Sequence, residues 1–112
     1  MRVIVCGSRR WTDRQQIASR LFDLPPDSTI VHGAAGGADR IAAQEAEKLG
    51  LLVEPWPAMW EAHGKRAGLI RNEQMAVMGA DLCIAFWDGR STGTAHMLTQ
   101  ARAHGIPVEV VT

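Results

Sequence analysis

The sequence lacks an excess of charge of either sign and lacks any long apolar run. Lysine plus arginine and aspartate plus glutamate each number 12, so the formal net charge is zero. Proteins that bind duplex DNA non-specifically are usually basic, and the balance argues against that function. No apolar stretch approaches the length of a membrane-spanning helix, and the one at the start is too short for a secretory signal. We therefore expect a cytoplasmic protein that does not act at a membrane.

Cysteine is scarce as well. Cys6 and Cys83 both lie within apolar runs, which predicts buried and unreactive thiols in a reducing compartment. Neither belongs to a CxxC or another zinc-binding spacing, and no other pattern typical of a metal site is present. We expect the protein to use neither a metal ion nor a cofactor.

What the sequence does contain is a regular alternation of apolar strands and amphipathic helices. Apolar runs predict strands at 2–6, 29–32, 51–56, 81–87 and 107–111. Helices are expected after Thr12–Gln15, which has the spacing of a capping box, and at about 38–49, 65–78 and 94–104, with a loop at 57–64. This alternation predicts one α/β domain over residues 1–112, with a parallel sheet covered by helices on both faces.

A glycine-rich loop follows the second predicted strand. Gly33, Gly36 and Gly37 lie between that strand and a helix that begins near Ala38. Such a loop either forms a tight turn or allows the backbone to approach a phosphate group. Asp39, just after it, either complements the positive N-terminus of the helix or belongs to a site.

Basic and aromatic residues gather at the same end of the predicted sheet, where open parallel sheets bind ligands. The basic residues are Arg9, Arg10, Lys65, Arg66 and Arg90, followed by Arg71 one turn into a helix, and the aromatic residues are all four tryptophans, Trp11, Trp56, Trp60 and Trp87. Arginine forks bind phosphate, and nucleobases stack on indole rings, so a nucleotide suits both residue types.

Each of these features also has a purely structural interpretation. Trp56 and Trp60 would then pack the 57–64 loop against the body of the protein, and Arg71 would pair with Glu73 or Asp81 on the surface. In the segment GRSTGT, Ser91 or Thr92 would serve only as the N-cap of the last helix.

Four segments carry a more specific pattern: GSRRW.D, HGAAGGAD..A...A...G, W..HGK.AG..RN..M and FWDGRSTGT..M...A...GIPV. In this order, and over nearly the whole chain, they resemble the SLOG superfamily, in particular its small YspA/YpsA-related branch. The resemblance implies a Rossmann-like three-layer fold with strand order 3-2-1-4-5 and a nucleotide or nucleotide-derived ligand. The ligand contacts that it implies are Gly7, Ser8, Arg9, Gly33, Gly36, Gly37, Asp39, Arg71, Asn72, Gly89, Ser91, Thr92, Gly93 and Thr94.

Two groups of relatives in this superfamily suggest further functions. The Lonely Guy enzymes hydrolyse nucleoside monophosphates, and their motif PGGxGTxxE aligns with residues 89–97 of this chain. Met97 stands where the motif has its catalytic glutamate, and a thioether can neither accept a proton nor stabilise an oxocarbenium ion. An N-glycosidase of this kind would need Arg71 together with a substitute acid, Asp39 or Asp88, so the resemblance leaves enzyme activity undecided.

The DNA-processing proteins of natural transformation bind single strands. Their GxARGxD loop and RN helix are similar to GAAGGAD and IRN here, although Gly36 stands where that loop has an arginine. A neutral chain is poorly suited to nucleic acid, so we expect a nucleotide-type small molecule as the partner and nucleic-acid binding only as a secondary alternative. Homodimers are common among such relatives, and the sequence does not show a dimer face.

Overall fold

The computed structural model describes all 112 residues, and five parallel strands form its single sheet. The strands are β1 (Arg2–Gly7), β2 (Thr29–His32), β3 (Leu52–Pro55), β4 (Leu82–Phe86) and β5 (Val108–Val111). Their order is β3-β2-β1-β4-β5, with β1 pairing in parallel with both β2 and β4. The predicted α/β fold class and the strand order 3-2-1-4-5 are confirmed.

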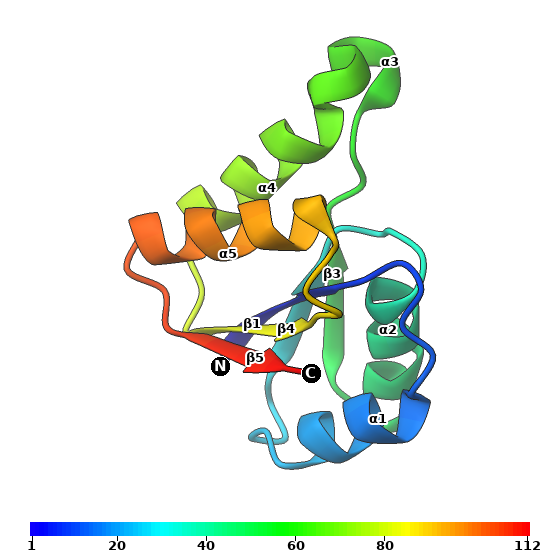
Figure 1. Ribbon diagram of the computed structural model, residues 1–112. Helices are drawn as coiled ribbons and strands as arrows, with labels where there is room; N and C mark the ends of the chain where they lie inside the picture. The colour runs from blue at the N-terminus through cyan, green and yellow to red at the C-terminus, as the bar shows by residue number, and fades with distance from the viewer.

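Helices cover both faces of the sheet (Figure 1). The helices α1 (Arg14–Phe22) and α2 (Ala38–Lys48) lie on one face, and α4 (Ala67–Met78) and α5 (Thr92–Ala103) lie on the other. A short helix α3 (Trp60–His63) and the 3₁₀ turn η1 (Gly64–Arg66) precede α4 and project beyond the sheet (Figure 1). No helix of the protein has both the length and the apolar character needed to cross a bilayer.

Successive side chains along β1 point to opposite faces of the sheet, so they contribute to two separate layers of the core. Val3 and Val5 are fully buried against the layer that α1 and α2 complete. Ile4 and Cys6 face the opposite way, into the layer that α4 and α5 complete. A central strand that is apolar on both faces is typical of a parallel sheet with helices on each side.

The main differences from the sequence prediction concern the starts of α1 and α5 and the segment before α4. The N-cap of α1 is Asp13, whose carboxylate accepts the N–H of Gln16 at 3.0 Å, so the capping box proposed from Thr12 is wrong by one residue. The expected loop at 57–64 contains α3, and the last helix begins at Thr92 instead of Thr94. Ser91 caps that helix because its hydroxyl accepts the N–H of Thr94.

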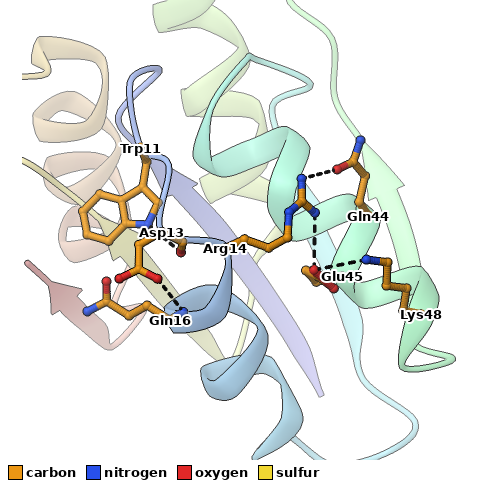
Figure 2. A network of polar contacts seen from close by, with 7 residues as sticks. All are labelled: Trp11, Asp13, Arg14, Gln16, Gln44, Glu45 and Lys48. Carbon is orange, nitrogen blue, oxygen red and sulfur yellow. Dashed lines mark hydrogen bonds and ion pairs between the residues drawn. The ribbon is translucent and has the colours of Figure 1, made fainter.

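A polar network joins α1 to α2 (Figure 2). The guanidinium of Arg14 donates to Gln44 at 2.8 Å and to Glu45 at 3.3 Å, and Lys48 donates to the same Glu45 carboxylate. Glu45 is only 7% exposed, and two cations offset the loss of water around its charge. The network holds α1, and with it the end of the loop that follows β1, against α2.

Candidate functional site

A cavity of about 690 Å³ opens where β1, β2 and β4 end. It is bounded by the loops after these strands, by α3 and η1, and by the first turns of α4 and α5. The predicted ligand contacts that line it are Gly7, Ser8, Arg9, Gly33, Asp39, Arg71, Asn72, Ser91, Thr92, Gly93 and Thr94. Gly36, Gly37 and Gly89 do not line it. The tertiary structure thus brings most of the predicted residues into one cavity.

Ser8 ties three of the surrounding segments together. Its N–H donates to the carbonyl of Phe86 at the end of β4, and its hydroxyl accepts the N–H of Asp88 at 3.0 Å. Its carbonyl accepts the N–H of Ala38, the first residue of α2, at 3.2 Å. Gly7 permits this close approach, since a Cβ there would collide with the Phe86 carbonyl and the Ala38 side chain.

The three glycines of the second loop have three different surroundings. A Cβ at Gly33 would collide with the guanidinium of Arg71. Gly37 has a φ of +67°, and a Cβ there would meet the carbonyl groups of Ser8 and Arg9. Only Gly36 faces open space. The backbone therefore requires glycine at position 37, whereas a side chain at position 33 would have to displace the end of Arg71.

Asp39 holds the glycine loop in place from inside. Its Oδ2 accepts the N–H of Gly33 at 2.9 Å and that of Ala35 at 3.4 Å, and the residue is only 5% exposed. Burial raises the pKa of Asp39 to about 6, although these two N–H groups and the charge of Arg71 oppose the rise. Asp39 therefore does more than complement the N-terminus of α2.

Arg71 and Asn72 connect α4 to the two neighbouring loops. Arg71 donates to the Gly33 carbonyl through Nη1 and to Asn72 Oδ1 through Nε, at 3.0 Å for the latter. Asn72 is buried, and its amide nitrogen lies 3.3 Å from the Gly93 carbonyl and 3.2 Å from His96 Nδ1. Arg71 pairs with neither Glu73 nor Asp81, so the surface ion pair considered above is not formed.

The first turn of α5 presents free donors to the cavity. The N–H groups of Thr92 and Gly93 belong to the first turn, where no helical carbonyl is available to accept them. The Asp88 carboxylate accepts the N–H groups of Arg90 and Ser91 at 2.8 and 3.1 Å, and these bonds lower the pKa of Asp88. The loop before α5 is thereby ordered without a ligand.

The cavity wall carries more positive than negative charge, although the whole chain is neutral. Its basic side chains are Arg9, Arg10, Lys65, Arg71 and Arg90, and its acidic ones are Asp39 and Asp88. None of these basic side chains forms an ion pair, whereas Arg2, Arg14, Arg20 and Lys48 all do. The unpaired cations are therefore available to an anionic ligand.

Of the four tryptophans expected near the ligand, only Trp60 lines the cavity. Trp11 packs against Phe86 with ring centroids 5.7 Å apart. The indole N–H of Trp56 donates to Glu54, and that of Trp87 donates to the Ser91 carbonyl. The expectation that all four indoles surround the ligand is corrected, because three of them pack or hydrogen-bond within the protein.

Some lining residues were not recognised from the sequence. Gly68 and Met75 lie three residues before Arg71 and three residues after Asn72, and Leu69 completes this part of the wall. The period of α4 places such residues on one side of the helix, so helical spacing from Arg71 was the signal available. Cys6 and Ala35 complete the floor and the glycine loop, and no pattern in the sequence singled them out.

The chain matches a known family of proteins and a known relative. A model of the YspA, cpYpsA-related SLOG family matches residues 1–63. The chain is 44% identical over 116 residues to the Gene 61 protein of Mycobacterium phage D29, an alignment that covers 96% of this chain and 93% of that protein.

Two solved structures share the fold. DNA processing protein A (DprA) from Streptococcus pneumoniae matches 99% of this chain with a TM-score of 0.83 and 19% identity, and the chain spans 50% of that protein's length. The C-terminal domain of a hydrogenase from Pyrococcus furiosus matches 99% of this chain and 91% of that domain, with a TM-score of 0.56 and 18% identity. At such identities the likeness shows the fold alone. By its family match, the chain belongs to the YspA, cpYpsA-related SLOG family.

Proposed function

We propose that this domain binds a nucleotide or a nucleotide-derived ligand in the cavity at the carboxyl ends of β1, β2 and β4, in a sensing or accessory role. The observation that carries the proposal is the set of unpaired basic side chains around a cavity of about 690 Å³ in a chain of zero net charge. No protein ion pair has to be broken before these side chains bind an anion, and arginine binds phosphate in a bidentate fashion.

The cavity offers separate places for the two parts of such a ligand. The free N–H groups of Thr92 and Gly93, beside Arg90, suit a phosphate group, because a helix N-terminus carries partial positive charge. Trp60 and Leu69 lie on the α3–α4 side of the cavity and are 53% and 43% exposed. An exposed indole in a cavity wall suits a flat base, which buries apolar area by stacking on it.

Hydrolysis of the ligand is a weaker candidate for the function of this cavity than binding alone. Met97, which replaces the glutamate of the hydrolase motif, is 1% exposed and packs in the core between the sheet and α5. The N–H groups of Arg90 and Ser91 lower the pKa of Asp88, which makes this carboxylate a weaker base. Asp39 is the one remaining acidic side chain in the wall. We expect incubation with nucleoside 5′-monophosphates to release no free base above the uncatalysed rate, and chromatography that shows turnover would favour an N-glycosidase instead.

A thermal-shift screen tests the proposal directly. Mononucleotides, ADP-ribose, dinucleotides and short oligonucleotides would be compared at equal concentration. A ligand present at 100 times its Kd stabilises the folded state by roughly 2.7 kcal/mol. A screen in which none of these compounds raises the melting temperature would contradict the proposal.

Oligonucleotides are the class of ligand to compare with mononucleotides. A few unpaired cations around a concave cavity can replace few counterions, so we expect single strands to bind weakly and their affinity to fall only slowly with salt concentration. Tight binding of single strands at about 150 mM salt, with no response to mononucleotides, would replace the proposed function by a nucleic-acid one.

A further inference from the structure

The Asp39 carboxylate has one oxygen that the protein leaves free. Both hydrogen bonds to this side chain, from Gly33 and Ala35, end on Oδ2. Oδ1 accepts no hydrogen bond. The only side-chain polar atom that is completely buried without a partner is Ser28 Oγ, so Asp39 Oδ1 is not completely buried. Since Asp39 lines the cavity and is only 5% exposed, the small exposed part of its carboxylate includes Oδ1. A buried and oriented acceptor therefore faces the ligand.

The character of this acceptor restricts what can lie beside it. The wall also holds five basic side chains and the N–H groups at the first turn of α5, which suit anionic oxygens. A carboxylate repels a phosphate group, and it accepts hydrogen bonds when ionised. We therefore expect hydrogen-bond donors, such as hydroxyl groups, in the part of a ligand that contacts Asp39 Oδ1.

Asp39 and the proposed phosphate position lie in different parts of one cavity wall. Asp39 belongs to α2, which follows β2, and Thr92 and Gly93 belong to the first turn of α5, which follows β4. A ribose 5′-phosphate can contact both parts, because its phosphate and its two ring hydroxyls lie at different ends of the sugar.

We propose that Asp39 Oδ1 accepts hydrogen bonds from the 2′- and 3′-hydroxyls of a ribose, so that the cavity selects ribonucleotides over 2′-deoxyribonucleotides. This inference rests on the proposed nucleotide-binding function and narrows the ligand class. A site that holds a buried acceptor for a hydroxyl discriminates against an analogue without it, because the acceptor is then left unpaired.

The test compares binding of the four ribonucleoside 5′-monophosphates with binding of their 2′-deoxy counterparts by isothermal titration. We expect the best ribonucleotide to bind roughly 10- to 100-fold more tightly than its deoxy analogue, the size of one hydrogen bond to a charged group. Equal affinities would overturn the role of Asp39 and leave nucleotide binding intact. No binding of any ribonucleotide would overturn both proposals.

A variant separates recognition of the sugar from support of the loop. Asp39→Asn removes the charge and keeps the size of the side chain, and we expect it to reduce affinity for the ribonucleotide while changing that for the deoxy analogue little. The ratio of the two affinities should fall toward one. A purely structural role of Asp39 would weaken both ligands equally and preserve the ratio, which would contradict the inference. Ser91→Ala, at the proposed phosphate position, provides the converse control, since it should weaken both ligands together.

Discussion

The guanidinium of Arg71 lies directly against the Cα of Gly33, and its Nη1 donates to the Gly33 carbonyl. These residues belong to α4 and to the loop after β2, so one contact fixes the position of the glycine loop relative to α4. Nη2 donates to no protein atom, because the hydrogen bonds of this side chain all come from Nε and Nη1. Arg71 is thus held in the wall of the cavity with one donor group remaining for a ligand.

Gly33→Ala should destabilise the protein through this contact. The added methyl group would displace the Arg71 guanidinium from the Gly33 carbonyl, and the loss of this hydrogen bond should cost about 0.5–1.5 kcal/mol. Urea denaturation of the single variant and of Gly33→Ala combined with Arg71→Ala measures the effect. The loss that Gly33→Ala causes should be much smaller when Arg71 is already alanine. An equal loss in both backgrounds would mean that the collision is not its origin.

Gly36→Ala and Gly37→Ala form a matched pair in one loop. Gly37 has a φ of +67° and lies against two carbonyl groups, whereas a Cβ added at Gly36 would meet no atom within 4 Å. We expect Gly37→Ala to lower the free energy of unfolding by about 1–3 kcal/mol or more and Gly36→Ala to change it by less than about 0.5 kcal/mol. Chemical denaturation of both variants checks this difference, and equal stabilities would show that the loop does not need glycine at 37.

Arg71→Lys should weaken ligand binding nearly as much as Arg71→Ala. Lysine has a single point charge and cannot donate both to the Gly33 carbonyl and to a ligand oxygen with the planar geometry of a guanidinium. The exposed and unpaired Arg102 near the end of α5 serves as the control, and Arg102→Lys should leave affinity unchanged. Full affinity in Arg71→Lys, measured by titration of the ligand identified in the screen, would exclude Arg71 from the site.

The pKa of Asp39 predicts a dependence of stability on pH. Burial raises this pKa from 3.8 to about 6, so between about pH 4 and pH 6 the folded protein binds more protons than the unfolded chain. The contribution of Asp39 to the free energy of unfolding is therefore highest below about pH 4. It falls by up to roughly 3 kcal/mol as pH rises through about 6. Glu54 has the opposite effect at lower pH, because its ion pair with Arg2 lowers its pKa to about 2.

Denaturation of the wild type and of Asp39→Asn between about pH 4.5 and pH 7 isolates the contribution of Asp39. Glu54 changes the free energy of unfolding mainly at pH values below this range, and this change is the same in the wild type and the variant. The wild type should lose stability relative to Asp39→Asn as pH rises. Parallel curves for the two proteins would show that the carboxylate is not destabilised by burial.

Tryptophan fluorescence should report the ligand through a single indole. Trp60 lines the cavity, whereas Trp11 packs against Phe86 in the core layer beneath α1 and α2. We expect a fluorescence change on ligand addition that Trp60→Phe abolishes and that Trp11→Phe retains. A change that persists in Trp60→Phe would place the base elsewhere in the cavity.

Local sequence patterns are sufficient to predict the secondary-structure elements and the end of the sheet where the cavity opens. Apolar runs with period two and helices with period 3.6 are local properties, so they predicted five strands and the main helices close to their observed bounds. In a parallel sheet the ends of all strands lie on one side, which is why residues as far apart as Ser8, Asp39 and Arg71 could be assigned to one site. The strand order came from the resemblance to a family, not from periodicity.

The contacts that each residue makes in the cavity depend on how distant parts of the chain pack together. The sequence shows three glycines in one loop, but their surroundings depend on Arg71 and on the carbonyl groups of Ser8 and Arg9, which lie in distant parts of the chain. Four tryptophans near one end of the sheet looked equivalent, and three of them have partners within the protein. Local patterns specify the period of an element and the face it buries, whereas the partner of a side chain depends on how elements distant in sequence pack together.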